Sequence, residues 1–326
     1  MRLSVQPVAG FRRSEAEAFS TMATMQIAAR SQYEWKLRTR ALQLGKRTLV
    51  MGILNVTPDS FSDGGEYASL SSALQHAFYM LDHGADIIDI GGESTRPGTA
   101  AGTGDAIGTG VEQARILPLI RHLMHARPDT IISVDTYRAS TARLAMEEGA
   151  EIVNDVSGML WDREMAATCA ELRCGVVAMH TRGLPSEWAK QARLQPNQIV
   201  PMVSTELHET ASRLMLAGCE RSSIVLDPGF GFGKTGNENW TLLHEMDQLQ
   251  ELGFPLLAGL SRKGFLGEAL RSTTGGEVPA PHLRDKATAA ANVIAALAGA
   301  HIVRVHDIRR TREAMAVTDA VREAAF

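Results

Sequence analysis

One short pattern, repeated along the chain, most restricts the folds available to it. Gly-Ala and one polar residue precede a run rich in Ile and Val at residues 84–90, 149–155 and 299–305. Glycine directly after a helical stretch is typical of a left-handed helix cap, and a continuous apolar run is typical of a strand buried on both faces. The repeated unit is therefore predicted to be a helix, a tight turn and a strand of a parallel sheet.

The same unit can be followed through most of the chain. Strands are predicted at about 48–54, 86–91, 130–134, 151–155, 175–180, 223–227, 255–260 and 301–305. Helices are predicted at about 69–83, 112–126, 137–148, 162–173, 202–217, 238–252, 284–298 and 308–323. Strict alternation of strands and helices indicates an α/β fold with a parallel sheet, and eight repeats indicate a closed (β/α)8 TIM barrel.

The barrel is expected to be a single domain over residues 33–326. Residues 33–47 are expected to form a short N-terminal hairpin that closes the floor of the barrel. Residues 1–32 contain both Arg and Glu and lack the apolar stretch of a secretory signal. They are interpreted as a leader that is disordered.

Composition narrows the classes of partner. The chain of 326 residues is 44% hydrophobic and 21% charged, with a net charge of −4, as expected of a soluble globular protein. Its basic residues form no long run, so neither nucleic acid nor an anionic membrane is expected as a partner. Cys169, Cys174 and Cys219 show no C-x-x-C spacing and are interpreted as small buried hydrophobes in a reducing compartment. A cytoplasmic location is expected.

Polar residues follow every predicted strand. In chain order they are Asn55; Glu93, Ser94 and Thr95; Asp135; Asn154 and Asp155; Met179 and His180; Asp227; Ser261, Arg262 and Lys263; and Arg304 and His306. Any one of them also fits a helix cap or a turn. Because the carboxyl ends of the strands of a (β/α)8 barrel meet at one mouth, the whole series predicts a site for a polar small molecule.

Three loops at this mouth carry unusual sequences. Residues 229–235 (G-F-G-F-G-K-T) resemble a phosphate-binding loop, but Pro228 occupies the position where that motif requires glycine. Residues 55–65 and 91–110 are long, polar and rich in Gly and Pro, which suits lids over a site but also fits loose surface connections.

The loops and strand ends together resemble the dihydropteroate synthase family. The two signatures are L-N-V-T-P-D-S-F-S-D-G-G at 54–65 and G-A-D-I-I-D-I-G-G-E-S-T-R-P-G at 84–98. Shorter motifs follow in the family's order: S-V-D-T at 133–136, N-D-V-S-G at 154–158, A-M-H at 178–180, L-D-P-G-F-G-F-G-K at 226–234, S-R-K at 261–263 and R-V-H-D at 304–307. The resemblance covers the chain from about residue 33 to its C-terminus.

The resemblance implies condensation of 6-hydroxymethyl-7,8-dihydropterin pyrophosphate with p-aminobenzoate, giving 7,8-dihydropteroate and pyrophosphate in folate biosynthesis. It implies a pterin pocket formed by Asp135, Asn154, Met179, Asp227, Phe232 and Lys263. The donor-rich edge of a pterin suits a carboxylate such as Asp227, and Lys263 suits the carbonyl side of the ring. An enzyme of this family is a transferase and a sulfonamide target.

The resemblance also places the other two ligands. Pyrophosphate is expected at Asn55, Thr95, Arg304 and His306, with Mg2+ bridging to Asn55, because donors and a metal stabilise a departing anion. p-Aminobenzoate is expected at Phe61, Thr95, Arg96, Pro97 and Ser261. The residues expected to act in the reaction are Asn55, Thr95, Asp135, Lys263, Arg304 and His306.

The family's mechanism is dissociative: pyrophosphate leaves first and the aryl amine then attacks. An aniline nitrogen is neutral at pH 7, so no strong general base is needed, and positioning and charge stabilisation carry the reaction. The loop after Pro97 departs from the family by being longer and richer in Gly, and Gly264 stands where a larger residue is usual. The family further implies a homodimer through the later helices. Two alternatives remain open: a non-catalytic pterin-binding paralogue and a pterin-dependent methyltransferase domain.

Overall fold

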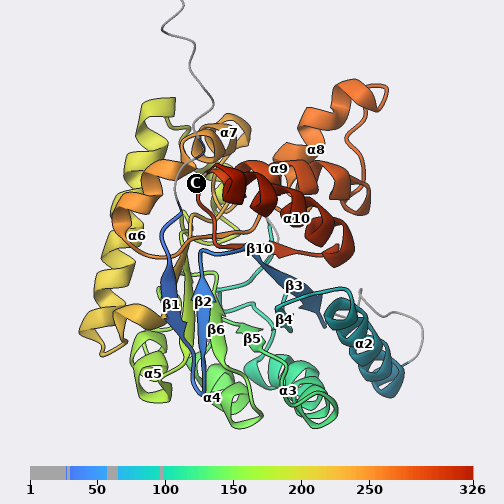
Figure 1. Ribbon diagram of the computed structural model, residues 1–326. Helices are drawn as coiled ribbons and strands as arrows, with labels where there is room; N and C mark the ends of the chain where they lie inside the picture. The colour runs from blue at the N-terminus through green and yellow to red at the C-terminus, as the bar shows by residue number, and fades with distance from the viewer. Residues whose placement is uncertain (1–26, 28–29, 57–64, 96–97, 326) are drawn as a thin grey trace, which may run out of the picture.

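The chain folds as a parallel β/α barrel with helices around its outside (Figure 1). The computed structural model describes residue 27 and residues 30–56, 65–95 and 98–325. The strands of the barrel are β3 (Leu49–Asn55), β4 (Ile87–Gly91), β5 (Ile132–Asp135), β6 (Ile152–Asp155), β7 (Gly175–Met179), β8 (Ile224–Asp227), β9 (Leu257–Ala258) and β10 (Ile302–Val305).

Parallel pairing carries the sheet around the barrel in the order β8-β7-β6-β5-β4-β3-β10-β9. A parallel bridge between Leu226 and Leu256, with the Leu226 amide donating to the Pro255 carbonyl at 3.0 Å, joins the two ends of that order. The predicted closed (β/α)8 barrel is therefore confirmed.

The helices follow the predicted alternation, with differences in detail. They are α2 (Gly65–Asp82), α3 (Thr109–Ala126), α4 (Ala139–Glu147), α5 (Met165–Leu172), α6 (Pro196–Leu216), α7 (Gly236–His244), α8 (Gly264–Leu270), α9 (Asp285–Leu297) and α10 (Ile308–Ala324). Five 3-10 turns accompany them in the described part of the chain: η3 (Trp188–Lys190), η4 (Arg221–Ser223), η5 (Met246–Leu252), η6 (Arg271–Thr273) and η7 (Pro281–Arg284).

Three elements differ from their predicted form. The helix predicted at 238–252 is divided into α7 and the 3-10 turn η5, and α8 was not predicted at all. The strand predicted at 255–260 is reduced to the two residues of β9. Pro255 has no N–H to donate to a ladder, and the amide of Leu256 donates to the ring of His301 at 3.1 Å instead.

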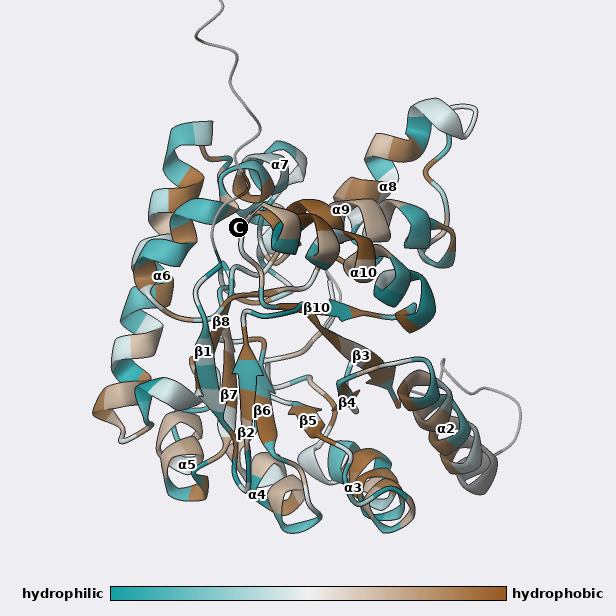
Figure 2. Ribbon diagram, viewed as in Figure 1, coloured by the Kyte–Doolittle hydropathy of each residue, from teal (hydrophilic) through white to brown (hydrophobic). Residues whose placement is uncertain are grey.

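Apolar side chains lie on both faces of the strands, as their continuous Ile/Val runs predict. Those that point outward pack beneath the helices and include Val50, Ile88, Val134, Val153, Val176 and Val303. Those that point inward fill the lower barrel and include Met51, Ile87, Ile152, Val177, Val225 and Ile302. Figure 2 shows the brown strands enclosed by helices whose outer sides are more hydrophilic. These inward side chains fill the floor side of the barrel, and the polar strand ends lie at its other end, the mouth.

The predicted hairpin is present and seals the lower end. β1 (Tyr33–Lys36) pairs with β2 (Ala41–Leu44) in antiparallel register. Trp35, Leu37 and Leu44 join the inward-facing cluster of the barrel strands. The indole of Trp35 is fully buried and its Nε1 donates to the Ser223 carbonyl at 2.8 Å. The hairpin is thus the floor that the sequence predicts.

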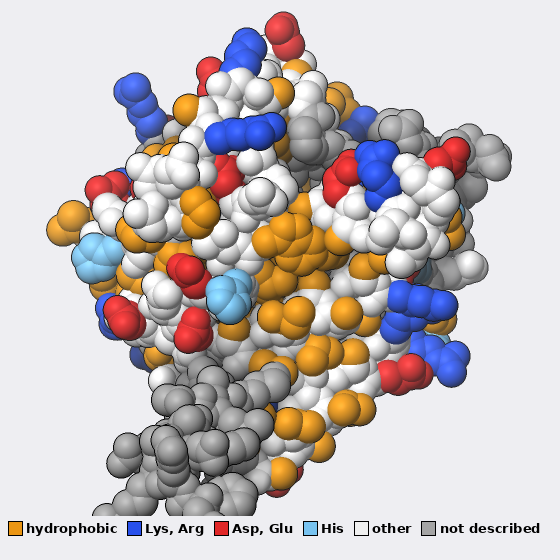
Figure 3. Space-filling model, turned by 90° about the horizontal axis from the view of Figure 1, so that it is seen from above, with side chains coloured by type: hydrophobic (Ala, Val, Ile, Leu, Met, Phe, Trp, Pro, Cys, Tyr) orange, Lys and Arg blue, Asp and Glu red, His pale blue; other side chains and the backbone are white. Residues whose placement is uncertain are grey.

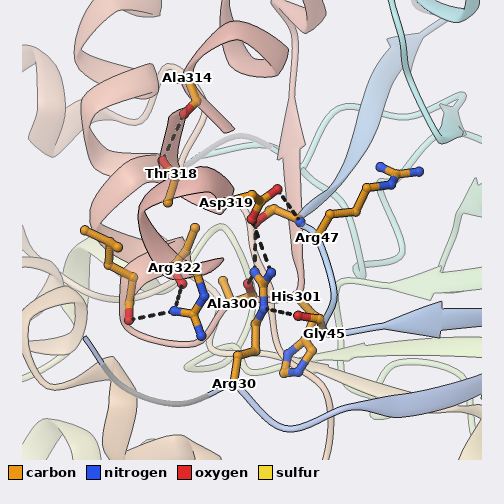
Figure 4. Close-up of polar contacts among 12 residues, drawn as sticks. Arg30, Gly45, Arg47, Ala300, His301, Ala314, Thr318, Asp319 and Arg322 are labelled. Atoms are coloured by element: carbon orange, nitrogen blue, oxygen red, sulfur yellow. Dashed lines mark hydrogen bonds and ion pairs between the residues drawn. The ribbon is translucent and has the colours of Figure 1, made fainter. Parts of the chain in front are cut away.

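A buried arginine ties the segment before the hairpin to the starts of the first and last barrel strands and to the last helix (Figure 4). Nη1 of Arg30 donates at 2.8 Å to both the Ala300 carbonyl and the Thr48 hydroxyl, and Nε donates to the Gly45 carbonyl at 3.1 Å. Its Nη2 donates to Asp319 of α10 at 3.2 Å, and Asp319 also accepts from the Thr48 amide at 2.8 Å. These contacts join the first barrel strand to the last helix.

The interpretation of the cysteines can be checked directly. Cys169, Cys174 and Cys219 are free thiols and buried, as their spacing predicts. Among the helices of the described residues, none combines the length and the apolar character that a membrane crossing requires.

Candidate active site

A chain of polar contacts crosses the barrel above the apolar floor, where side chains come from the three neighbouring strands β4, β5 and β6 and from β10. Nε of Arg304 on β10 donates to Asp89 Oδ2 on β4 at 2.6 Å, and Nη2 of the same guanidinium donates to Asp135 on β5. Asn154 on β6 donates to the same Asp89 oxygen through Nδ2 at 3.0 Å. Three of the predicted strand-end residues, Asp135, Asn154 and Arg304, therefore meet in space, and Asp89 from the middle of β4 joins them.

Charge balance in this group depends on Arg304. Burial raises the pKa of Asp135 to about 7, although Arg304 opposes the shift. Burial by itself would lower the pKa of Arg304, but Asp89 and Asp135 outweigh it and hold that pKa above its usual value. A guanidinium paired with two carboxylates in a poorly solvated site stays charged. It supplies a fixed positive charge at the mouth.

Asp227, Lys263 and Phe232 form the opposite side of the mouth. Asp227 is buried at the end of β8, which raises its pKa, and its Oδ1 accepts from the Gly229 amide at 2.7 Å. Burial lowers the pKa of Lys263 to about 7, with Asp227 opposing. Nζ of Lys263 lies 3.8 Å from the ring centroid of Phe232, a cation–π contact. A carboxylate and an amine thus share one poorly solvated side of the mouth with an aromatic ring.

The rim is formed by Ser261 and His306 on one side and by Asn55 on the other. The hydroxyl of Ser261 lies 2.9 Å from Nδ1 of His306 and accepts from the His306 amide at 3.2 Å. Asn55 and Asp135 flank Gly91, to which both are paired in register. A Cβ added at Gly91 would lie 3.6 Å from Asn55 Oδ1 and 3.3 Å from Asp135 Cβ. Glycine at 91 leaves this part of the mouth open.

Two further predicted residues lie beside these groups. Met179 is buried at the end of β7, against the loop that follows β8, since a Cβ at Gly229 would lie 3.1 Å from Met179 Cγ. Thr95 is half-buried in the loop after β4. Phe61, Arg96 and Pro97, expected at p-aminobenzoate, lie outside the described residues.

Several polar strand ends have structural partners instead of facing the mouth. Asp155 accepts from the amides of Ser157 at 2.7 Å and Met159 at 3.1 Å, so it shapes its own loop. Arg262 forms an ion pair with Asp285 at 2.8 Å. The turn-forming interpretation of strand-end residues is therefore correct for these positions.

Glu93 anchors the loop after β4. Its Oε2 accepts from the Tyr137 hydroxyl and from Arg138 Nη1, both at 2.8 Å. The Tyr137 hydroxyl in turn accepts from the Gly102 amide at 3.1 Å. Farther along, Gly98 N donates to the Pro185 carbonyl at 3.1 Å. The described part of this long loop after β4 is thus attached to the barrel at several points.

Asp89 and Lys234 are parts of the site that the sequence analysis missed. Asp89 is fully buried, and its Oδ1 has no hydrogen-bond partner among the described residues. Its signal was a carboxylate inside an Ile run, a position that a strand buried on both faces reserves for apolar side chains. Lys234 is also buried, and Nζ donates to three backbone carbonyls.

Asn55 offers one oxygen to a magnesium ion, which suits an ion held mainly by water and by the phosphates of the substrate. Among the described residues no cluster of three or more His, Cys, Asp and Glu side chains offers a metal site. Mg2+ is usually bound by one or two protein oxygens together with water and substrate phosphates. The amide oxygen of Asn55, on the open side of Gly91, is a protein ligand of that kind.

Comparison with known proteins shows the family to which the chain belongs. Residues 51–306 match the family described as pterin binding enzyme. The dihydropteroate synthase of Mycobacterium leprae is 44% identical over 83% of this chain and 92% of its own. That of Bacillus subtilis is 40% identical over 86% of this chain and 91% of its own.

Solved structures show the same fold. Xanthomonas albilineans dihydropteroate synthase, determined with 4-aminobenzoic acid, is 38% identical and covers 90% of this chain and 99% of its own, with a TM-score of 0.79. The same enzyme in complex with 7,8-dihydropteroate gives a TM-score of 0.75 at 36% identity, over 89% and 98% of the two chains. The Yersinia pestis enzyme in a sulfonamide drug complex gives 0.79 at 37% identity, over 89% and 99%.

Proposed function

The chain belongs to the dihydropteroate synthases of the pterin binding enzyme family, and from this premise we propose which of its residues carry the reaction. The enzyme is a transferase of folate biosynthesis that joins 6-hydroxymethyl-7,8-dihydropterin pyrophosphate to p-aminobenzoate. Its products are 7,8-dihydropteroate and pyrophosphate. Each relative named above is a synthase, so none of them supports the methyltransferase alternative.

The pterin ring would bind between the two sides of the mouth. Asp227 would accept from the guanidine-like edge of the ring. Its Oδ1 accepts from the Gly229 amide, while a Cβ added at Gly259 would lie 3.4 Å from its Oδ2, so the glycine leaves space beside that oxygen. Asp135 and Asn154 would meet the other polar edges of the ring, and Lys263 would donate to its carbonyl side. Met179 and Phe232 would pack on the ring faces, as apolar walls of ligand sites do.

The pyrophosphate would lie at the rim, against Arg304, His306, Asn55 and Thr95. Arg304 remains charged because Asp89 and Asp135 hold it, and its placement is fixed before substrate arrives. Preorganised positive charge favours a developing anion without rearrangement at the moment of reaction. A bound Mg2+ would supply further stabilisation of that negative charge, with Asn55 as its ligand from the protein.

p-Aminobenzoate would enter last, beside Ser261, Thr95, Phe61, Arg96 and Pro97. Its amine is neutral near pH 7 and can attack the exocyclic methylene carbon once the carbon–oxygen bond to pyrophosphate has broken. A residue that removes a proton beforehand is not required. The protein's contribution is to hold the amine within reach of that carbon.

The single observation that carries this assignment is the convergence of Asp135, Asn154, Asp227, Lys263 and Arg304 on one poorly solvated mouth. The test is to measure pyrophosphate release and dihydropteroate formation with both substrates and Mg2+. Asp227→Ala should abolish pterin binding while circular dichroism shows a retained fold. A well-folded parent protein that binds pterin without forming product would be the non-catalytic paralogue.

We also propose that the enzyme is a homodimer through its later helices. Large apolar side chains stay exposed there: Trp240 on α7, Leu283 in η7, Ile294 on α9, and Val317 and Val321 on α10. Figure 3, which looks onto the upper side of Figure 1, shows apolar side chains gathered on the face where these helices lie. A second copy would cover this face, as large exposed apolar areas usually mark interfaces.

Sedimentation of the parent and of Val317→Glu tests the dimer. A folded, monomeric variant is expected, with a melting temperature that no longer depends on protein concentration. A parent that sediments as a monomer at all concentrations would exclude the dimer. A cytoplasmic location is proposed on the grounds that the three cysteines are reduced.

A further inference from the structure

Lys234 is a buried amine. Among the described residues, the hydrogen bonds of its Nζ all go to backbone carbonyls. Its Nζ donates to the Gly229 carbonyl at 2.8 Å and to the carbonyls of His180 and Phe232, both at 3.3 Å. An ammonium has three N–H donors, so these three acceptors match the protonated form of the side chain. The match matters because a buried charge without hydrogen bonds is costly.

The three carbonyls belong to two different segments. Gly229 and Phe232 lie in the glycine-rich loop, defined here as residues 228–235 between β8 and α7, whereas His180 follows β7. Lys234 therefore closes the glycine-rich loop on itself and attaches it to the neighbouring strand end. The approach is close: a Cβ at Gly229, whose φ is +66°, would lie 1.9 Å from the His180 carbonyl oxygen.

The glycine-rich loop carries or contacts the proposed pterin residues. The ring of Phe232 lies over Nζ of Lys263 at 3.8 Å. Gly231 lets the Lys263 stem pass, since a Cβ there would lie 3.2 Å from Lys263 Cδ. The Gly229 amide donates to Asp227 Oδ1 at 2.7 Å, which fixes the orientation of that carboxylate. A change in loop shape would therefore move the groups on one whole side of the mouth.

Asn239 is a second clasp on the same loop. Its Oδ1 accepts from the Gly231 amide at 2.7 Å, and its Nδ2 donates to the carbonyls of Lys234 and Thr235, both at 2.9 Å. Asn239 is buried, as Lys234 is, and the hydrogen bonds of its side chain all go to backbone atoms of the loop. Neither side chain is among the residues that the family resemblance assigned to substrate.

We propose that Lys234 is a positioning residue, whose ammonium holds the glycine-rich loop in the one shape that presents Phe232 and Asp227 to the pterin ring. The inference rests on the proposed function of the mouth. It assigns to Lys234 a role in pterin affinity that is exerted through the loop and without contact to substrate.

The test compares Lys234→Met with Lys190→Met, which removes an exposed lysine from the nearby turn η3. For Lys234→Met, kcat/KM for the pterin pyrophosphate should fall about 100-fold, as misplacement of binding groups by roughly 1 Å can cause. Most of that loss should be in KM for the pterin, while KM for p-aminobenzoate stays close to that of the parent. Lys190→Met should match the parent in every parameter.

Two outcomes separate positioning from general stability. Lys234→Arg, which keeps a buried cation with several donors, should recover part of the pterin affinity at a similar melting temperature to Lys234→Met. Lys234→Met with a lower melting temperature but an unchanged pterin KM would overturn the proposal. If Lys234→Met does not fold, Asn239→Ala decides: a raised pterin KM supports the role of the loop, and an unchanged KM rejects it.

The dissociation constant of pteroic acid, measured by calorimetry, keeps this inference separate from the proposed function. If the parent binds pteroic acid without turnover, the same variants are compared by that constant. A parent that neither binds pteroic acid nor forms product overturns the proposed function itself. A fully active parent with an equally active, equally tight-binding Lys234→Met overturns only the positioning role.

Discussion

Arg304 and Asp89 are 215 residues apart in the chain and form a 2.6 Å ion pair inside the barrel. The Asp89 side chain is fully buried and that of Arg304 is mostly buried. The pair exists because β3 lies between β10 and β4 and brings their inward-facing side chains toward one another. It orients the guanidinium that is proposed to receive pyrophosphate. Stability and the proposed catalytic role of Arg304 therefore depend on the same contact.

Replacement of Asp89 tests that dependence. Asp89→Ala leaves Nε of Arg304 and Nδ2 of Asn154 without their shared acceptor, and loss of one partner of a buried ion pair costs about 3–5 kcal/mol. Urea unfolding should show this loss, and the remaining folded enzyme should release pyrophosphate far more slowly. Asp82→Ala, which breaks the exposed pair with Arg127, should cost no more than about 1 kcal/mol.

Asp135 predicts a pH dependence of stability with a definite sign. Its folded pKa is raised by burial to about 7 from a reference value of 3.8, so the folded chain retains this proton where the unfolded chain has lost it. The resulting stabilisation is fully present below the unfolded pKa and is lost as the pH rises through the folded pKa. Relative to Asp135→Asn, the parent should therefore gain free energy of unfolding as the pH falls from about 8 to about 5. A difference that stays constant over this range would show that Arg304 keeps Asp135 ionised.

The Arg30 contacts predict a structural role for the segment before the hairpin. Arg30 is almost fully buried and paired with Asp319, so Arg30→Ala should lower the free energy of unfolding by about 3–5 kcal/mol. Arg47→Ala removes a half-exposed partner of Asp86 and should cost at most about 1 kcal/mol. Equal melting temperatures for the two variants would contradict the anchoring role of Arg30.

The loop after β4 should affect p-aminobenzoate through its attachment at Tyr137. Tyr137→Phe removes the hydroxyl that joins Glu93 to the Gly102 amide, and each lost hydrogen bond is worth about 1 kcal/mol, or roughly fivefold in affinity. KM for p-aminobenzoate should rise by about that factor, with little change in KM for the pterin. Tyr79→Phe on the surface of α2 is the matched control. An unchanged KM would show that the loop does not reach the second substrate.

Asn55 predicts how the enzyme responds to magnesium. Chelation of Mg2+ should slow pyrophosphate release, since the departing charge loses a counter-ion. Asn55→Ala should raise the Mg2+ concentration needed for half-maximal rate. Pteroic acid lacks pyrophosphate, so it should bind to Asn55→Ala as tightly as it binds to the parent. A magnesium requirement identical in Asn55→Ala and the parent would remove Asn55 from the metal site.

The repeated Gly-Ala pattern and the apolar runs determined the barrel, because they record helix ends and buried strands that form locally. Strand ends such as Asp227 and Arg304 were predictable for a related reason: the carboxyl end of every strand in this fold reaches the same mouth. The short β9 was not predictable from its own residues. His301, which lies beyond α9, takes the Leu256 amide that a longer strand would have used.

By itself, then, the amino-acid sequence determined which residues are strands, which strand ends are polar, and, through its ordered motifs, the family. The tertiary structure alone decided which polar residues face the mouth and which shape their own loops, as Asp227 and Asp155 illustrate. It also decided the partners of Asp89 and Lys234, whose hydrogen bonds reach across strands or back through a loop. Local sequence reports the conformation of neighbouring residues, but a contact between distant ones exists only once the barrel has closed.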